Sequence, residues 1–465
     1  MSIVERVGLM DIEKTVKMQR KYYETQKTKS WKYRMAALNR LERAILKWET
    51  EINKALKKDL NKSAFEAYMT EVGMTLAELR YVKKNLRKWM MDKKVRTPLA
   101  QFPSKSYVKS EPYGVVLIMS PWNYPFMLCM EPLIGALAAG NCCVLKPSNY
   151  SPAVSTVIKG MIEETFLKEY VTVVEGGRAE NQSLLEQKFD YIFFTGGVQV
   201  GKMVMKKAAE HLTPVTLELG GKSPCIVEKT ADLKLAAKRL VFGKFLNAGQ
   251  TCVAPDYLLV QKEVKEEFLQ YVLFWIEKMY GKGLENRESY PKIINEKHFK
   301  RIKQLIEGEE ILIGGAVEED SLQIAPTVLN HVSSKSPIMQ EEIFGPVLPV
   351  LEFENIQEAV QFVRKGPKPL ALYLFTGDKM VERRITEQLS YGGGCINDTI
   401  IHLATSHMGF GGVGESGMGS YHGKESFDTF SHKKSIVKKY NWLDNPVRYV
   451  PYGKQKEKIM RMFLK

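Results

Sequence analysis

The feature that most constrains the fold is the regular alternation of short, continuously apolar runs with longer stretches of helical periodicity. The apolar runs lie at residues 115–119, 141–145, 171–174, 191–194 and 215–219, with helical stretches at 126–139, 151–167 and 198–211. A strand that is apolar at every position, rather than at every second one, is typical of a sheet covered on both faces. The pattern therefore predicts consecutive βαβ units and a buried parallel sheet.

The same alternation continues through the second half of the chain. We expect helices at 232–245, 263–280, 296–307, 355–364 and 378–389, and strands at 257–261, 310–313 and 370–375. Gly392–Gly394 and the glycine-rich run 409–419 are expected to interrupt the alternation, because glycine weakens both helices and strands. A second α/β unit is therefore expected after the first.

The regions before and after these units have different patterns. Residues 11–92 are expected to be helical, because large apolar residues recur there at steps of three and four, namely Leu38, Leu41, Ile45, Trp48, Ile52 and Leu56. Residues 93–112 contain several prolines and indicate an exposed arm or hairpin. Residues 454–465 could form a basic helix, which we expect to pack on the body or on a partner subunit rather than on a membrane.

Length, charge and cysteine content limit the class of protein. A chain of 465 residues suits two or three domains. The formal charge of +15 comes with lysines spread along the whole chain, without the clustering that attracts nucleic acid, so no nucleic-acid partner is expected. The six cysteines show neither disulfide-framework nor zinc spacing. With no signal peptide and no run of about 20 apolar residues, we expect a cytoplasmic protein without a stable membrane anchor.

Cys252 lies in the run Asn247–Asp256, between an expected helix and an expected strand. Gly249 and Pro255 keep this run from being helical, so the thiol is predicted to sit on a short bend. A bend between two packed elements can aim a nucleophile at a substrate. Most cysteines are nonetheless inert and protonated, so this run alone decides nothing.

A glycine-rich turn follows the expected strand at 191–194. Its residues Thr195, Gly196, Gly197 and Gly201 suit a phosphate, because glycines let a ligand approach the backbone amides at the start of a helix. The run contains neither Gly-x-Gly-x-x-Gly nor the Lys-Ser/Thr of a P-loop. A simple tight turn between strand and helix explains it equally well.

Two polar residues lie at the ends of apolar strands, where parallel sheets collect ligands. Asn123 stands between two prolines, and its amide could donate to a developing oxyanion or could satisfy its own loop. Glu218 ends a strand, so its carboxylate is either paired or, with a pKa raised by burial, available as a general base. The acidic run Gln340–Pro346 identifies nothing unaided.

Together these runs resemble the signatures of the aldehyde dehydrogenase superfamily. The matching runs, in family order, are Pro121-Trp-Asn-Tyr-Pro125, Leu217-Glu-Leu-Gly-Gly-Lys222, Gly249-Gln-Thr-Cys252 and Glu341-Glu-Ile-Phe-Gly-Pro346. Cys252–Tyr257 and Ser416–Lys424 resemble the class 3 branch. The resemblance implies an α/β fold with a Rossmann-type, parallel-sheet cofactor domain, an α/β catalytic domain and a small β oligomerisation arm.

The resemblance also implies domain boundaries and an assembly. The NAD(P)-binding domain would comprise 1–92 and 113–220, the catalytic domain 221–424 and the oligomerisation arm 93–112 and 425–445, with a basic tail at 446–465. A homodimer is implied as well.

The resemblance implies a role for each motif residue. Cys252 would be the nucleophile, Asn123 with the Cys252 amide the oxyanion hole, and Glu218 the general base for hydrolysis. The cofactor contacts would be Lys146 at the adenosine ribose, Thr195, Gly196, Gly197 and Gly201 at the pyrophosphate, and Glu342 at the nicotinamide ribose, with Phe344 nearby. The implied reaction is NAD- or NADP-dependent oxidation of a medium- or long-chain aliphatic or aromatic aldehyde to a carboxylic acid, through a cysteine thiohemiacetal and thioester.

One position departs from the family pattern. Family members often carry Lys-Pro-Ser-Glu, with the glutamate on the adenosine 2′-hydroxyl, where this chain has Lys146-Pro-Ser-Asn149. Because neutral Asn149 would not repel a 2′-phosphate, we expect NADP to be tolerated along with NAD. Two alternatives stay open. One is a coenzyme A-acylating aldehyde dehydrogenase, which Glu218 argues against because such enzymes usually lack it, and the other is a non-catalytic basic binding protein.

Overall fold

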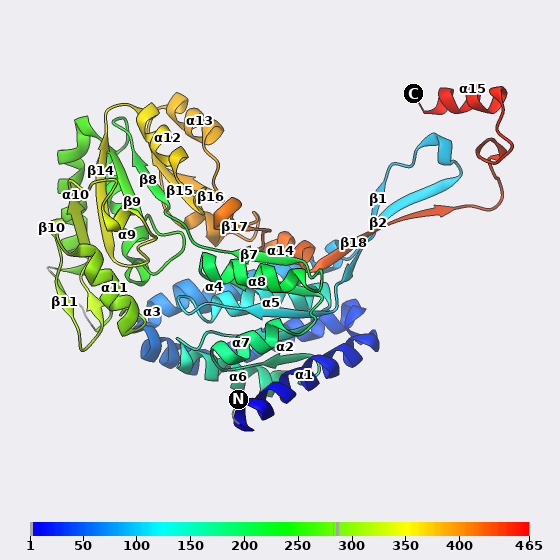
Figure 1. Cartoon of the computed structure of the whole chain (residues 1–465), viewed down its shortest axis with the longest axis horizontal. Helices are drawn as coiled ribbons and strands as arrows, with labels where there is room; N and C mark the ends of the chain where they lie inside the picture. The colour runs from blue at the N-terminus through cyan, green and yellow to red at the C-terminus, as the bar shows by residue number, and fades with distance from the viewer. Residues whose placement is uncertain (1–2, 282, 285–287, 465) are drawn as a thin grey trace.

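The computed structural model describes residues 3–281, 283–284 and 288–464, which form two α/β halves and a projecting β arm (Figure 1). Within these residues the first half holds a six-stranded sheet, the second a seven-stranded sheet and the arm a three-stranded sheet. A two-stranded ribbon of β11 (Val317–Glu318) and β12 (Gln323–Ile324) flanks the second half. The α/β class expected from the alternating pattern is confirmed.

The first sheet has the strand order β17-β7-β6-β3-β4-β5. Its parallel strands are β3 (Val115–Met119), β4 (Cys142–Lys146), β5 (Val171–Val173), β6 (Tyr191–Thr195) and β7 (Val215–Glu218). The short strand β17 (Gly417–Met418) joins antiparallel to β7. The connecting helices are α5 (Met127–Ala139), α6 (Pro152–Thr165), α7 (Arg178–Leu185) and α8 (Val198–Ala209). Every residue of β3 and β4 is buried, which explains their continuous apolar runs.

The second sheet has the order β10-β13-β14-β9-β8-β15-β16. Its strands are β8 (Pro224–Val227), β9 (Tyr257–Gln261), β10 (Glu310–Ile313), β13 (Thr327–Asn330), β14 (Val347–Phe353), β15 (Ala371–Phe375) and β16 (Gly393–Ile396). The helices of this half are α9 (Leu233–Phe245), α10 (Lys265–Tyr280), α11 (Glu296–Ile306), α12 (Ile356–Lys365) and α13 (Lys379–Gln388). All neighbouring strands run parallel except β10 with β13.

The N-terminal region is helical, as expected, except at two breaks. Its long helices are α1 (Ile3–Glu24), α2 (Trp31–Leu60) and α4 (Gly73–Trp89), and the short α3 (Ala64–Ala67) and a π-helical turn, η2 (Tyr68–Val72), link the last two. The breaks contain Gln26 and Asn61, whose φ values of 63° and 58° are left-handed and incompatible with a continuing helix. Helix α2 packs on α6, and α4 packs on α5, so these helices cover the first sheet.

The arm projects from the body in Figure 1 as a three-stranded antiparallel sheet. Its strands are β1 (Lys93–Val95), β2 (Ser104–Pro112) and β18 (Ser431–Lys439). Before β18, α14 (Gly423–Thr429) packs on α4 and α5 of the body. Beyond the arm, the expected tail helix forms as α15 (Lys454–Phe463), which lies away from both α/β halves in Figure 1. Among the described helices, none has the length and apolar character needed to cross a bilayer.

The sequence pattern missed eight strands and misjudged one glycine run. The missed strands are β8, β11, β12, β13, β14, β16, β17 and β18. The expectation that Gly392–Gly394 interrupts the pattern is wrong, because β16 begins at Gly393 and pairs with β15. The two strands approach so closely that a Cβ added at Gly394 would lie 2.0 Å from the carbonyl oxygen of Leu372. Glycine is required here by packing rather than by a turn.

Candidate active site

The first sheet places its ligand-binding edge where the strand order reverses. From β3 the chain builds outward through β4 and β5, then returns to add β6 and β7 on the other side of β3. Ligands of such sheets bind outside the carboxyl ends of the strands at this switch point. The loop after β3 carries Asn123, and the neighbouring strand β6 ends at Thr195, directly before Gly196 and Gly197. Two of the sequence-predicted runs therefore leave the sheet next to each other.

Cys252 follows α9 in a turn with an unusual backbone. Asn247, Ala248 and Gly249 all have positive φ, at 54°, 50° and 71°. Left-handed conformations are costly for residues with side chains and persist only where the surroundings fix them. Glycine is required at position 249, because an added Cβ would lie 2.2 Å from the carbonyl oxygen of Gly345. The turn that carries the thiol thus packs against the loop before β14.

Side-chain hydrogen bonds join the Cys252 turn to the Asn123 loop. Asn123 Nδ2 donates to the carbonyl oxygen of Gln250 at 3.0 Å, and Asn247 Nδ2 donates to the carbonyl oxygen of Asn123 at 2.9 Å. The hydroxyls of Tyr124 and Thr251 lie 2.6 Å apart. An amide group has two N–H donors, so Asn123 can offer the second one to a ligand. The structure therefore brings Asn123 and the Cys252 turn together from distant parts of the sequence.

Cys252 opens onto an apolar cavity of about 250 Å³. Apolar side chains form most of the wall, namely Met69, Met74, Met127, Leu128, Phe242, Leu246, Ile400, Ile401, Leu403, Ala404 and Phe410. Polar atoms come from Thr70, Tyr124, Thr251, Tyr421 and His422. A largely apolar cavity with a few converging polar groups is the usual form of a small-molecule site.

The Cys252 thiol is strongly held in its protonated form. Its pKa is raised to about 12, first by burial and then by the carboxyl groups of Glu342 and Glu218. Cys252 is half-buried and lines the cavity. A thiol attacks a carbonyl carbon as thiolate, so this site needs a proton acceptor or a nearby positive charge.

Glu218, at the end of β7, is a buried carboxyl group without a partner. Glu218 is 2% exposed, and neither of its carboxyl oxygens has a hydrogen-bond partner in the described chain. Burial raises the pKa of Glu218 well above its ordinary value. A buried polar group left unsatisfied lowers stability, and such groups cluster at functional sites. Because Glu218 raises the pKa of Cys252, the two groups lie within electrostatic reach of each other.

The loop before β14 brings Glu342 to the same region. Its carboxylate lies against Gly220, where an added Cβ would be 2.1 Å from Oε2, and burial raises the pKa of Glu342 to about 8. Arg301 holds the loop by donating to two of its carbonyl oxygens, at 3.3 and 2.6 Å. Phe344, with a φ of 50°, makes an edge contact with Trp122. The sequence-predicted Glu342 and Phe344 therefore lie on one fixed loop.

The carboxyl edge of the first sheet fits a dinucleotide. Lys146 ends β4, is 3% exposed and donates from Nζ to the carbonyl oxygens of Pro147 and Gly176 at 2.9 and 2.7 Å. Gly197 precedes α8, and an added Cβ there would meet nothing within 4 Å, which leaves open space over the helix N-terminus. The buried Thr195 Oγ1 has no hydrogen-bond partner among the residues described. Open space, free amide groups and an unsatisfied hydroxyl together suit a phosphate.

The other sequence-predicted cofactor residues divide into packing and surface positions. Added Cβ atoms at Gly196 and Gly201 would each lie 2.6 Å from a side chain, that of Phe194 and that of Leu219. These two glycines are therefore required by packing. Asn149 is exposed, and its Nδ2 would lie 3.4 Å from a Cβ added at Gly177.

Several charged residues near the site escaped sequence reasoning. Lys62 and Glu71 form an ion pair of 2.6 Å in which both side chains are 0% exposed. His422 lines the cavity, and its Nε2 lies 3.1 Å from Glu131 Oε2. His422 lies in the run Ser416–Lys424 that resembles the class 3 branch, but no local motif marks the other three residues. The one available signal among those three was the charge of Glu131 inside an otherwise apolar helix.

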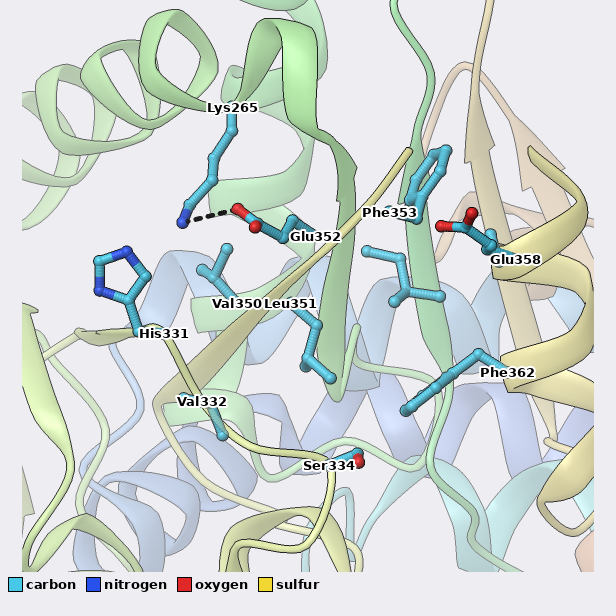
Figure 2. Close-up of a pocket in the computed structure, with 12 residues that line it drawn as sticks. Lys265, His331, Val332, Ser334, Val350, Leu351, Glu352, Phe353, Glu358 and Phe362 are labelled. Atoms are coloured by element: carbon cyan, nitrogen blue, oxygen red, sulfur yellow. Dashed lines mark hydrogen bonds and ion pairs between the residues drawn. The ribbon is translucent and has the colours of Figure 1, made fainter. Parts of the chain in front are cut away.

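A second pocket, of about 460 Å³, lies beside β14 and α12 (Figure 2). Lys265 and Glu352 point toward each other in Figure 2, and their Nζ and Oε2 atoms are 3.2 Å apart. His331, at the same pocket, pairs with Glu310 at 3.1 Å. The lining of this pocket includes no cysteine. Its ionisable groups are paired, and it shares no lining residue with the Cys252 cavity.

Sequence comparison identifies relatives along nearly the whole chain. The Aldehyde dehydrogenase family matches residues 2–436. The 4,4'-diaponeurosporen-aldehyde dehydrogenase of Staphylococcus aureus (strain NCTC 8325 / PS 47) is 50% identical over 446 residues, which cover 96% of this chain and 97% of that protein. Aldehyde dehydrogenase family 3 member B1 of Mus musculus is 43% identical over 443 residues, 95% of each protein.

Solved structures of related enzymes share the fold. A substrate-bound state of Staphylococcus aureus AldH matches with a TM-score of 0.96 at 48% identity, over 100% of each chain. Betaine aldehyde dehydrogenase from Staphylococcus aureus, in complex with NAD+, matches with a TM-score of 0.83 at 28% identity, over 94% of this chain and 90% of that one. These relationships confirm the class 3 resemblance and identify an NAD(P)-dependent oxidoreductase that oxidises aldehydes. The chain belongs to the aldehyde dehydrogenase family.

Proposed function

We propose that this enzyme oxidises apolar aldehydes to carboxylic acids through a thioester on Cys252. Asn123 is the oxyanion donor, and Glu218 is the base that activates water. One observation carries the proposal: a thiol that opens onto an apolar cavity lies within electrostatic reach of a buried, unpartnered carboxyl group. A nucleophile, a base and a hydrogen-bond donor are the parts that acyl transfer requires.

The first half of the reaction forms and oxidises a covalent adduct. The Cys252 thiolate attacks the carbonyl carbon of the aldehyde, and the oxygen that becomes negative accepts hydrogen bonds from Asn123 Nδ2 and the Cys252 amide. Bound NAD(P) supplies a two-electron acceptor and, in its oxidised form, a positive charge that favours the thiolate. When the aldehyde hydrogen departs with its electron pair, the thiohemiacetal on Sγ becomes a thioester.

The second half of the reaction releases the acid. The Glu218 carboxylate removes a proton from water, and the water oxygen attacks the thioester carbon. The carbon–sulfur bond then breaks, the proton passes from Glu218 to the departing sulfur, and the carboxylic acid and the Cys252 thiol are released. The raised pKa of Glu218 makes its ionised form a stronger base than an exposed glutamate. A coenzyme A-acylating enzyme transfers the acyl group to a thiol and needs no such base, so Glu218 favours hydrolysis over that alternative.

The cavity wall supports a preference for apolar substrates. Its methionine, leucine, isoleucine and phenylalanine side chains gain free energy by covering a hydrocarbon chain or an aromatic ring. Methionines such as Met69, Met74 and Met127 adapt to substrates of different shape. Medium- or long-chain aliphatic and aromatic aldehydes are therefore the proposed substrate class.

The cofactor contacts are proposed at the carboxyl edge of the first sheet. Lys146 would hold the adenosine ribose, the turn Thr195–Gly201 the pyrophosphate, and Glu342 the nicotinamide ribose, with Phe344 beside it. The exposed, neutral Asn149 supports tolerance of the 2′-phosphate of NADP. Asn149→Glu should weaken NADP binding relative to NAD, which fluorescence titration measures. An unchanged ratio of the two dissociation constants would remove Asn149 from the explanation.

A homodimer, built through the arm, is part of the proposal. The arm and the segment after it expose large apolar side chains, including Phe102, Val437 and Trp442, as a surface that another subunit would cover. Helix α15 exposes Met462 and Phe463 in the same way. The domain division at 1–92 with 113–220, 221–424, 93–112 with 425–445, and 446–465 is retained as a proposal. A cytoplasmic location is proposed from the six free cysteines.

Product analysis tests the proposed reaction and substrate class together. Purified enzyme is given NAD and short, medium and long linear aldehydes, benzaldehyde and 4,4'-diaponeurosporen-aldehyde, each with and without coenzyme A. We expect the carboxylic acid as product under both conditions, and a kcat/KM that rises with apolar surface. Preferential formation of an acyl-CoA, or a higher kcat/KM for short polar aldehydes, would contradict the proposal.

A further inference from the structure

Lys62 is a fully buried lysine at the junction between α2 and α3. It is 0% exposed, and the ion pair that it forms with Glu71 is buried to the same degree. A lysine held in the interior lowers stability unless each of its N–H groups has a partner. The identity of those partners therefore indicates why the lysine is there.

Each of the three N–H groups of Lys62 has one partner within reach. Nζ donates to Glu71 Oε1 at 2.6 Å and to the carbonyl oxygen of Asn123 at 3.0 Å. It also lies 4.0 Å from the ring centroid of Tyr124, within the range of a cation–π contact. Two of the three partners thus belong to the loop that carries the proposed oxyanion donor.

Glu71 holds the other end of the same loop. Its Oε2 accepts hydrogen bonds from the backbone N–H groups of Phe126 and Met127, at 2.9 and 3.2 Å, where α5 begins. Glu71 belongs to the π-helical turn η2, and such turns inside helices are frequent at functional sites. The ion pair therefore fixes both ends of the segment from Asn123 to Met127.

The same loop is bonded to the turn that carries the nucleophile. The carbonyl oxygen of Asn123 accepts from both Lys62 and Asn247, so both of its lone pairs are occupied. The Asn123 side chain donates to Gln250, two residues before Cys252. The direction of the Asn123 amide is thus set by its own backbone, and Lys62 is one of the two donors that set that backbone.

We propose that Lys62, paired with Glu71, is a positioning residue for aldehyde oxidation. It fixes the main chain of Asn123 so that the amide points at the oxygen that becomes negative. Lys62 does not line the cavity among the described residues, so it acts through Asn123. The inference rests on the role proposed for Asn123. An oxyanion donor accelerates a reaction only when it is aligned beforehand, which is what an over-determined loop provides.

Kinetic measurements in the wild-type and N123A backgrounds distinguish a positioning role of Lys62 from a general role in packing. The double variant K62M/E71Q removes both charges, keeps most of the side-chain volume and leaves no lone buried charge. We expect kcat to fall about tenfold to a hundredfold, less than the loss of an oxyanion donor itself, with KM for NAD(P) unchanged within about twofold. In an N123A background, the same double substitution should change kcat by less than about twofold, because the amide that it positions is gone.

Two outcomes would overturn the inference. One is a fall in kcat of the same size in both backgrounds, which would mean that Lys62 acts on packing alone. The other is wild-type kcat in K62M/E71Q. The N123A variant reports on the proposed function separately. If N123A alone keeps wild-type kcat, Asn123 is not the oxyanion donor. The inference about Lys62 then also fails, but the N123A measurement shows that the cause is the role assigned to Asn123.

A matched control and a second variant complete the test. Lys265 is also a buried lysine, 4% exposed, and it pairs with Glu352 at the pocket of Figure 2. K265M/E352Q should leave kcat within about twofold, because its loss has no route to Asn123. If K62M/E71Q does not fold, K62R replaces it. A planar guanidinium does not reproduce the three positions of an ammonium, and non-additivity with N123A remains the criterion.

Discussion

The Cys252 cavity and the pocket beside β14 differ in how their ionisable groups are satisfied. At the pocket beside β14, Lys265 pairs with Glu352 and His331 pairs with Glu310. Among the groups that act on the cavity thiol, Glu218 has no hydrogen-bond partner within the described chain, and the pKa of Cys252 is raised to about 12. The paired pocket is the larger of the two, at about 460 Å³ against about 250 Å³. Volume alone therefore does not locate the active site.

The comparison indicates that the proposed active site contains a buried group, Glu218, whose lack of a partner lowers the stability of the fold. A carboxyl group whose pKa is raised on folding, such as Glu218, keeps its proton to a higher pH than an exposed glutamate does. The contribution of Glu218 to the stability of the folded state is therefore most favourable at low pH and is lost as pH rises through its raised pKa. The pairs at the pocket beside β14 avoid this loss, and they have no unsatisfied group to offer a substrate.

Removal of the Cys252 sulfur should have the largest effect on activity. Cys252→Ala should lower kcat for aldehyde oxidation by at least about 10⁴-fold, because the covalent route is lost with the nucleophile. Binding of NAD(P), followed by fluorescence, should be unchanged, since the proposed cofactor contacts lie on other residues. Substantial aldehyde oxidation by this variant would show that the cavity thiol is not the nucleophile.

The rate of Cys252 alkylation, measured at several pH values, tests whether a nearby carboxyl group raises the pKa of the thiol. Glu342 has a pKa of about 8, so above pH 8 it is ionised and disfavours the Cys252 thiolate. In Glu342→Gln that repulsion is absent, so the Cys252 pKa falls and iodoacetamide should react about three- to tenfold faster at pH 9, with little change below pH 7. Peptide mapping restricts the rate to Cys252. A slower or unchanged reaction at pH 9 would mean that Glu342 does not act on the thiol.

The smallest effect is expected at the pocket beside β14. Lys265→Met should leave kcat and KM within about twofold, since neither residue of its ion pair lines the Cys252 cavity. Because Glu352 is half-exposed, the substitution should also lower the free energy of unfolding by only about 1 kcal/mol, which a denaturant titration measures. A tenfold loss of kcat in a folded variant would show that the pocket beside β14 contributes to catalysis, as the Cys252 cavity does.

The sequence predicted most of what depends on local pattern. The continuous apolar runs of β3, β4 and β6 predicted a parallel sheet, and the signature runs around Cys252, Glu218 and Asn123 predicted the resemblance to aldehyde dehydrogenases. Both kinds of signal lie within a few neighbouring residues. They survive in the structure because strand burial and loop chemistry are set over the same short distance.

The sequence could not predict what depends on long-range contact. Lys62 reaches an Asn123 carbonyl oxygen 61 residues away, and nothing in its own run distinguishes it from a surface lysine. Gly197 and Gly201 look alike in sequence, yet an added Cβ would meet open space at the first and Leu219 at the second. Which glycine admits a ligand and which admits a neighbouring side chain is decided only when the chain is folded.

Capture of the covalent intermediate in the Glu218→Gln variant tests the central claim most directly. The variant keeps the nucleophile and lacks the proposed base, so the thioester should form and persist. After addition of a long-chain aldehyde and NAD(P), intact mass spectrometry and peptide mapping should find one acyl group on Cys252, with release slowed about 10²- to 10⁴-fold. An unmodified Cys252 in the presence of reduced cofactor, an acyl group on another residue, or release at the wild-type rate would contradict the account.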